Sequence, residues 1–241
     1  MVIYKILLFS AIALEFVFVP LFLKAMWPTR SKKSLALKII CSTLFVFAGL
    51  FAVKISGNTS LFSKFIFLGL LFGWLGDFFL HVSSKVIYFL FGLLSFLAGH
   101  IFYICAYCWA IGRYFPGVRF FDIAETAAFF FVFGIAVLYA VLQKMKFGIA
   151  LIPITAYTAI LILMFTKASS LGLRMVFATM QDAKLICALL MLGALLFVIS
   201  DSLLGIMMFN GKKNSHPMKI VNIITYFAAQ ILLACTILFL K

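Results

Sequence analysis

The chain has 241 residues, of which 66% are hydrophobic and 11% charged, and its formal net charge is +14. A soluble domain carries charge on about a quarter of its residues, so the composition excludes a soluble protein and indicates an all-α, polytopic membrane protein. The basic residues are spread over short joints and form no patch, which favours a membrane surface over nucleic acid as their partner.

Eight apolar segments, each near the ~20 residues that a spanning helix needs, are separated by charged or Gly- and Pro-containing joints. They are Val2–Leu23, Leu35–Ile55, Leu61–Leu80, Val86–Ile111, Ile123–Leu142, Phe147–Phe165, Leu185–Phe209 and Met218–Leu240. The joints are short, and the longest are Lys24–Ser34, Gly112–Asp122 and Thr166–Lys184. The sequence therefore predicts one domain over residues 1–241, a bundle of eight transmembrane helices, with its function inside the helices or at their rims.

Basic residues in the first and seventh joints set the expected orientation. The first joint and the start of the next segment carry Lys24, Arg30, Lys32, Lys33 and Lys38, and the seventh joint and the start of the last segment carry Lys212, Lys213 and Lys219. Placing these joints on the inner side of the membrane puts both termini on its outer side. The predicted location is a bacterial inner (cytoplasmic) membrane.

Polar residues interrupt the first and third apolar segments. Glu15 lies just past the middle of the first segment, where a helix-packing hydrogen bond is expected. In the third segment Gly69, Gly73, Asp77 and His81 follow one another at intervals of four and so lie on one stripe. Small residues on this stripe let another helix approach, so Asp77 is predicted to face protein, whereas His81, near a loop, is expected to be solvated.

The later segments carry further polar faces. In the fourth segment Phe96, His100, Tyr103 and Tyr107 share a face, and in the eighth Asn222, Tyr226 and Gln230 form a stripe at intervals of four. Pro153 in the sixth segment is expected to kink the helix near Thr155 and Tyr157.

Two aspartates are the most informative residues. Asp77 and Asp201 stand in matching apolar stretches, 71–80 and 195–204, in the third and seventh segments. A carboxylate in hydrocarbon costs several kcal/mol, so such residues usually face a bundle interior or a wet cavity and are functional. The sequence predicts a polar cavity opening on one face. The alternative is that they only bond neighbouring helices.

Several short motifs carry a resemblance to a known family. They are Gly76-Asp77-x-x-Leu80, Gly92-Leu93-x-x-Phe96-x-x-x-His100-x-x-Tyr103, Pro153-x-x-x-Tyr157, Gly193-Ala194-x-x-Phe197-x-x-Ser200-Asp201-x-x-Leu204 and Tyr226-x-x-Ala229-Gln230. In order and spacing over most of the chain, these motifs are similar to those of the lysoplasmalogenase (YhhN-like) family of integral membrane proteins. Members often carry Lys-Pro where the second span begins. Here Lys33-Ser34 stands instead, and Ser34 can serve as the N-cap.

The resemblance implies an eight-span enzyme that hydrolyses the vinyl ether bond of lysoplasmalogens within the bilayer. Its products would be a fatty aldehyde and glycerophospho-ethanolamine or -choline, and its catalytic residues would be Asp77 and Asp201. Two carboxyl groups in a low-dielectric cavity can share one proton, so that one acts as the acid while the other stays ionised. Glycosidase carboxylate pairs work through similar oxocarbenium-like states. Which aspartate is the acid is left open.

Other polar residues are candidates for substrate binding. They are His100, Tyr103, Tyr157, Tyr226 and Gln230, with Lys85, Lys212 and Lys213 at the rim as candidates for holding the headgroup phosphate. For His100 and for the stripe of the eighth segment, plain interhelical hydrogen bonding is an equal alternative. The rim lysines can also be simple topology signals.

Two other functions compete with the hydrolase. A proton-coupled transporter would load and release protons on the same aspartates, and a lipid-binding or structural membrane protein would have no turnover. Transporters usually have Gly- or Pro-broken helices in matched positions of both halves, and here Pro153 has no counterpart in the second segment. No spacing of Cys and His fits a metal site and no Gly-rich phosphate loop is present, so no metal and no cofactor are expected.

Overall fold

The computed structural model describes residues 2–57, 59–210 and 215–240, and this part of the chain is all helical without strands. The helices are α1 (Val2–Ala25), α2 (Lys32–Ser56), α3 (Leu61–Val82), α4 (Val86–Tyr114), α5 (Ile123–Leu142), α6 (Leu151–Phe177), α7 (Ala183–Phe209) and α8 (His216–Cys235). Short 3-10 turns, η1 (Gly148–Ala150) and η2 (Thr236–Leu238), adjoin α6 and α8. Each of the eight described α-helices is long and apolar enough to span a membrane. The chain is therefore a multi-pass integral membrane protein, and the predicted fold class is confirmed.

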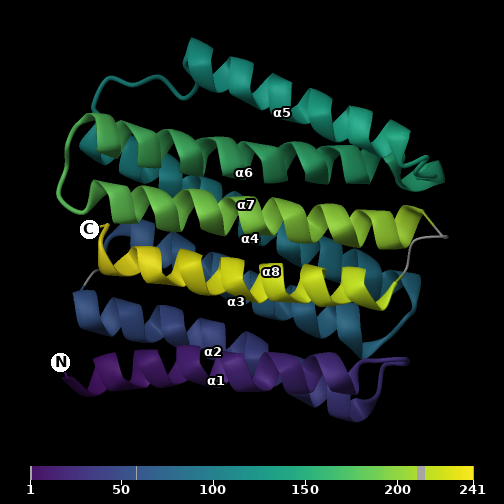
Figure 1. The fold of residues 1–241 in the computed structure, drawn as a ribbon. Helices are drawn as coiled ribbons and strands as arrows, with labels where there is room; N and C mark the ends of the chain where they lie inside the picture. Colours follow the sequence, from purple (N-terminus) through teal and green to yellow (C-terminus); the bar gives the residue numbers. More distant parts are fainter. Residues whose placement is uncertain (1, 58, 211–214, 241) are drawn as a thin grey trace.

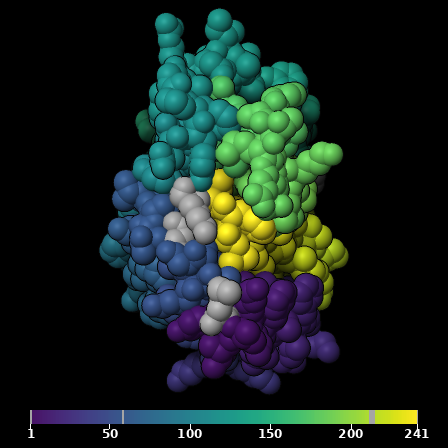
Figure 2. All heavy atoms as spheres, turned by 90° about the vertical axis from the view of Figure 1, so that its left-hand side faces the viewer, coloured from purple at the N-terminus to yellow at the C-terminus, as the bar shows by residue number. Residues whose placement is uncertain are grey.

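The eight helices lie side by side and alternate in direction, so both termini lie at the same end of the bundle (Figure 1). Helix α8 is central and packs against α1, α2, α3 and α7, whereas α1 and α5 lie at opposite edges. Figure 2 views the bundle from the end that holds the termini, with α1 in purple at the bottom and teal helices at the top. The other end, where α2, α4, α6 and α8 begin, holds the polar site.

Helices α3 and α4 approach each other closely at a pair of glycines. The carbonyl oxygen of Gly69 lies 3.2 Å from the position that a Cβ on Gly99 would occupy. A Cβ on Gly69 would collide with the ring of Tyr103, and one on Gly73 would collide with the amide of Gln230. The stripe predicted from Gly69, Gly73, Asp77 and His81 is buried throughout, so this prediction is confirmed. Its glycines admit polar side chains from α4 and α8.

This packing predicts opposite effects for two glycine substitutions. We expect Gly69→Ala to lower the free energy of unfolding in detergent by about 1–3 kcal/mol, because the added methyl overpacks against Tyr103. Gly134→Ala in α5 is the matched control, since a Cβ there meets no described atom within 4 Å, and we expect a gain of up to about 1 kcal/mol from helix propensity. Titration with a denaturing detergent measures both. Equal effects of the two substitutions would contradict this account of the α3–α4 contact.

The sixth helix is longer than predicted. The sequence expectation ended it at Phe165 and assigned 166–184 to a joint, but α6 continues to Phe177. The error came from Lys167, which resembles a loop residue in sequence. In the structure this lysine is 2% exposed; its Nζ donates to a carboxylate oxygen of Glu125 at 2.7 Å and to the carbonyl of Phe120. A buried charge is tolerated when it is paired, so the helix runs on through it.

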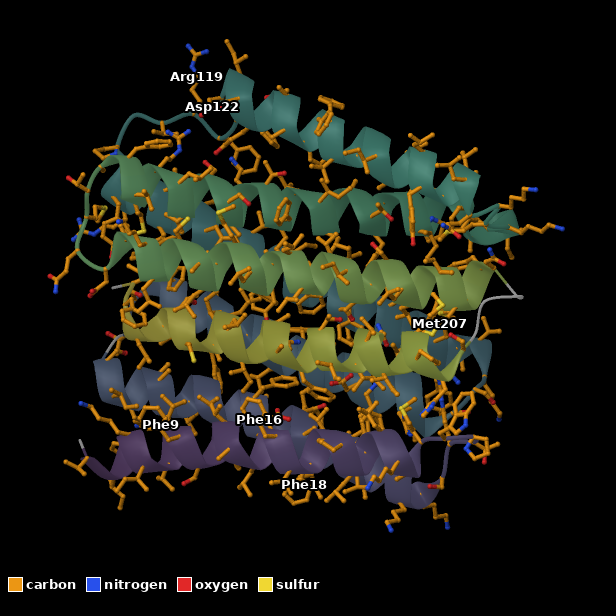
Figure 3. All side chains as sticks on the ribbon, viewed as in Figure 1. Phe9, Phe16, Phe18, Arg119, Asp122 and Met207 are labelled. Carbon is orange, nitrogen blue, oxygen red and sulfur yellow. The ribbon has the colours of Figure 1, made fainter. Side chains whose placement is uncertain are left out.

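A cluster of charged residues ties the start of α5 to α6. Asp122 caps α5 by accepting from the backbone N–H of Glu125, and this bond, with the nearby Arg174, lowers the pKa of the Asp122 carboxyl. Arg174 also donates to Asp122, and the hydroxyl of Ser170 donates to Glu125. Figure 3 shows Asp122 and Arg119 beside the start of α5, far from Met207 near the end of α7. This cluster therefore lies away from the polar site.

Two further expectations about helix starts are wrong. Pro153 was expected to kink the sixth helix, but α6 begins at Leu151, so the proline stands in the first turn, where a backbone N–H has no partner to lose. Ser34 was expected to be the N-cap of the second helix. Ser31 is the N-cap, and Ser34 completes a capping box with it from the third helical position.

Candidate active site

Asp77 is the centre of a buried polar network between α2, α3 and α8. One oxygen of its carboxylate lies 2.9 Å from Nζ of Lys38, and the other accepts from the hydroxyls of Ser42 at 2.5 Å and Tyr226 at 2.8 Å. Asp77 itself is only 1% exposed. Lys38 and Ser42 stand four residues apart on α2 and so reach the carboxylate from one helical face. The predicted orientation of Asp77 towards protein is confirmed.

The network continues from Asp77 along α8 to α4. The amide of Gln230 donates to the hydroxyl of Tyr226 at 3.1 Å, and the hydroxyl of Tyr103 donates to the Gln230 carbonyl at 2.6 Å. All three side chains are buried. The structure thus brings together four residues that the sequence analysis named, in one hydrogen-bonded chain from Asp77 to Tyr103.

Asp201 on α7 has a different set of neighbours. Its carboxylate accepts from the hydroxyl of Tyr157 at 2.5 Å, and Nε2 of His100 lies 3.4 Å from the same oxygen. The same His100 nitrogen lies 3.1 Å from the Tyr157 hydroxyl. Asp201 is more open than Asp77, with 11% of its side chain exposed against 2%. A proton donor needs this access to its substrate.

The two aspartates line one cavity, which we call the polar cavity. Its volume is about 360 Å³. It extends to the loop before α2, where Arg30 lines it, and to the loop before α4, where Ser83 and Ser84 line it. Its other polar residues come from α2, α3, α7 and α8: Lys38, Asp77, His81, Ser200, Asp201, Lys219, Asn222 and Tyr226. The predicted polar cavity lined by both carboxyl groups is therefore confirmed. In the described part of the chain no hydrogen bond joins the two carboxyl groups, so the expectation that they share one proton stays a prediction.

A second space, the apolar cavity, lies between α4, α5, α6 and α7. Its volume is about 140 Å³, and most of its lining side chains are aliphatic or aromatic, with Thr158, Asp201 and Ser202 as polar exceptions. It shares with the polar cavity the residues Leu80, Phe89, Phe96, Asp201, Leu204 and Met208. Asp201 therefore stands where a polar and an apolar space adjoin, and a molecule with one charged end and one hydrocarbon end fits that arrangement.

The basic residues at the cavity differ from those named in sequence. Arg30, Lys38 and Lys219 line the polar cavity, whereas Lys85 is an exposed residue before α4 and is not among the lining residues. Lys212 and Lys213 lie outside the described residues. Lys38 and Lys219 had been counted only as topology charges, although the position of Lys38 inside an apolar segment was a signal that it has a buried partner.

Two other side chains depart from expectation. His81 was expected to be solvated but is 6% exposed, and its Nε2 lies 2.8 Å from the hydroxyl of Ser34. Asn222 donates to the backbone carbonyl of Ser200 at 2.7 Å and to its hydroxyl at 2.9 Å, next to Asp201. The eighth-helix stripe thus bonds to α7 through Asn222 and to Asp77 through Tyr226, so it joins the surroundings of both aspartates.

Glu15 is another buried carboxyl near Asp77. It is 6% exposed and within electrostatic reach of Asp77, but neither of its carboxyl oxygens has a hydrogen-bond partner in the described part of the chain. The expected helix-packing hydrogen bond is therefore wrong. A buried polar group without a partner is a cost that the rest of the fold must offset.

Removal of the Glu15 carboxyl is expected to stabilise the protein. We expect Glu15→Met to raise the free energy of unfolding by about 1–3 kcal/mol, since methionine is apolar and of similar length. Phe16→Leu is the neighbouring control, because Phe16 is 78% exposed and should be near neutral. Unfolding in a denaturing detergent measures both variants, and a loss of stability in Glu15→Met would mean that the carboxyl makes a favourable interaction.

Comparison with known proteins gives one match. Residues 33–237 fit the family model described as the YhhN family. The searches of curated proteins and of solved structures each found no match. The matched region begins at the start of α2 and includes both aspartates and every polar partner described for them.

Proposed function

Since the chain belongs to the YhhN family, the family of the lysoplasmalogenases, we propose that it hydrolyses the vinyl ether bond of lysoplasmalogens. The substrate is a 1-alkenyl-glycerophospho-ethanolamine or -choline taken from the bilayer. The products are a fatty aldehyde and the corresponding glycerophospho-alcohol. The proposed location is the inner membrane of a bacterium.

The observation that supports this proposal most strongly is the position of Asp201 on the walls of both cavities. In a lysoplasmalogen the vinyl ether joins the hydrocarbon chain to the glycerol phosphate. A chain in the apolar cavity and a phosphate in the polar cavity would bring that bond to Asp201. Asp77 lines the polar cavity, where the phosphate would lie.

The surroundings of the two aspartates favour different roles. Asp77 accepts from two hydroxyls and forms an ion pair with Lys38, which suits a carboxylate that stays ionised and orients water. Asp201 has the more accessible side chain, and its only cationic candidate among the described residues is His100, whose nearest nitrogen is 3.4 Å away. We assign Asp201 as the general acid.

The reaction can be written with all atoms balanced. Asp201 transfers its proton to the β-carbon of the vinyl ether, the double bond electrons form the new C–H bond, and the α-carbon becomes an oxocarbenium ion. Water adds to the α-carbon and gives its proton to the Asp201 carboxylate, which leaves a hemiacetal. The hemiacetal hydroxyl then passes its proton to the glycerol oxygen as the bond between the α-carbon and that oxygen breaks. The glycerol oxygen keeps the electron pair of the broken bond, the hydroxyl oxygen forms the C=O bond, and the aldehyde and the alcohol are released. A positioned proton donor contributes about 10²–10⁴-fold to such a step.

Basic residues of the polar cavity are suited to the headgroup phosphate. Arg30 donates one N–H to the carbonyl of Leu80 at 2.7 Å, which orients the guanidinium while its other donors remain for a ligand. Lys219 lies over the ring of Trp27 at 4.9 Å. These two residues, rather than Lys85, are the proposed phosphate ligands. His100, Tyr103, Tyr157, Tyr226 and Gln230 are proposed to hold the aspartates and the substrate in position.

The decisive experiment uses the purified protein in detergent with a 1-alkenyl lysophospholipid and measures free aldehyde. The 1-acyl and 1-alkyl ether analogues are the controls, since neither has a vinyl ether to protonate. Aldehyde from the alkenyl lipid alone supports the proposal. Absence of aldehyde together with pH-driven substrate uptake into liposomes would replace it with the proton-coupled transporter.

A further inference from the structure

Helix α5 is the least packed of the described helices. Glu125 is its only buried residue, and large apolar side chains remain open along most of its length, for example Phe131 at 70% and Val141 at 67%. Among the described helices, its backbone approaches α6 alone. At the edge of the bundle, α5 stands apart from the tightly packed α3–α4 pair (Figure 1).

Polar contacts hold α5 at its two ends. At its start, the carboxyl groups of Asp122 and Glu125 bind Arg174 and Lys167 of α6. At its far end, the amide of Asn210 donates to the carbonyl of Gln143 at 2.5 Å, and the backbone N–H of Lys146 donates to the carbonyl of Phe209 at 3.0 Å. The helix is thus fixed at both ends, while its second half, from Phe133 to Val141, covers a space.

That space is an apolar crevice between α5 and the first turns of α6. It has a volume of about 300 Å³ and is lined by side chains such as Phe133, Val137 and Leu151. Its walls share six residues with the apolar cavity: Ala136, Ala140, Met145, Phe147, Ile154 and Thr158. The crevice at the outer edge of the bundle therefore adjoins the apolar cavity, whose walls include Asp201.

We propose that the hydrocarbon chain of a single-chain lipid lies in this crevice and reaches Asp201 sideways from the bilayer, between α5 and α6. This inference rests on the proposed function for the identity of the lipid. The occupant is a hydrocarbon chain because Asp201, at the inner end, is the only charged residue that lines the crevice or the apolar cavity in the described chain. The small side chains of Ala136 and Ala140 lie on the wall that the crevice shares with the apolar cavity.

The direction of the lipid follows from the same geometry. The basic residues Arg30 and Lys219 line only the polar cavity, on the other side of Asp201. When the phosphate of the lipid lies in the polar cavity and its chain lies in the crevice, the ether linkage between them lies beside Asp201. The reverse orientation would place a phosphate against mostly apolar walls that carry no basic residue in the described chain, which is unfavourable for a charged group. The crevice therefore binds the tail, and the end of the tail lies between α5 and α6.

Photo-crosslinking tests this placement without relying on turnover. The probe is a 1-O-hexadecyl lysophospholipid with a diazirine at the end of its chain, which has no vinyl ether to cleave, and the full-length protein is held in lipid nanodiscs. After irradiation, mass spectrometry locates the label. We expect label within residues 133–158, removed by excess 1-O-hexadecyl lysophospholipid without the diazirine. Label that concentrates on other helices, or that the competitor does not remove, would overturn the proposal.

A matched pair of variants makes the test specific. Ala140→Phe places a large side chain in the crevice. We expect it to lower the labelling that the competitor removes by about tenfold, because the added ring overpacks the space that the lipid chain would occupy. Ala127→Phe on the exposed side of the same helix should leave labelling unchanged. Equal labelling of both variants would contradict the proposal. Labelling in the crevice by a protein that releases no aldehyde would remove the proposed reaction but retain the lipid site, so the two failures are distinguishable.

Discussion

Replacement of Asp201 by asparagine is expected to lower kcat for vinyl ether hydrolysis by about 10²–10⁴-fold, because asparagine is similar in shape but has no carboxyl proton to transfer. The hydroxyl of Tyr157 and the ring of His100 can still contact the amide, so the protein should keep its fold. Aldehyde release measures kcat, and thermal unfolding in detergent measures the fold.

Ser202→Ala is the matched control for this variant. Ser202 follows Asp201 in the chain and lines the apolar cavity, so its replacement tests whether any small change at this place slows the enzyme. We expect the alanine variant to stay within about threefold of the wild type, as for a group that takes no part in proton transfer. A folded Asp201→Asn protein with wild-type turnover would remove the acid role from this residue.

Replacement of Lys38 by methionine is expected to lower the free energy of unfolding by about 3–5 kcal/mol. The change leaves Asp77 as a buried carboxylate without its ion-pair partner, and broken buried pairs typically cost that much. Lys54→Met, at the exposed far end of the same helix, should cost less than about 1 kcal/mol. Unfolding in a denaturing detergent compares the two variants.

The double variant Lys38→Met/Asp77→Asn separates charge from packing. With both charges removed, no uncompensated ion remains, and we expect the double variant to recover at least half of the stability lost in Lys38→Met. It should remain inactive, because the ionised carboxylate is missing. If the double variant is as unstable as Lys38→Met, the packing of the lysine stem, rather than its pairing with Asp77, is what α2 contributes.

Much of the candidate site could be named from sequence because polar residues are costly in hydrocarbon. Asp77, Asp201, His100, Tyr103, Tyr157, Tyr226 and Gln230 interrupt apolar segments, and the structure brings them into two connected groups. Lys38, Arg30 and Lys219 were not linked to the site, because lysine and arginine near the end of a span are also ordinary topology signals. The catalytic and binding roles of all these residues stay predictions.

The amino-acid sequence by itself determined the class of the protein, the eight spans and the faces on which polar residues lie, because segment length, hydropathy and a period of 3.6 residues are local properties. Only the tertiary structure decided which polar residues meet. The rotation and depth of each helix pair Lys38 with Asp77 and Lys167 with Glu125, and they leave Glu15 without a partner. Those pairings join residues far apart in the chain, so local sequence patterns do not predict them.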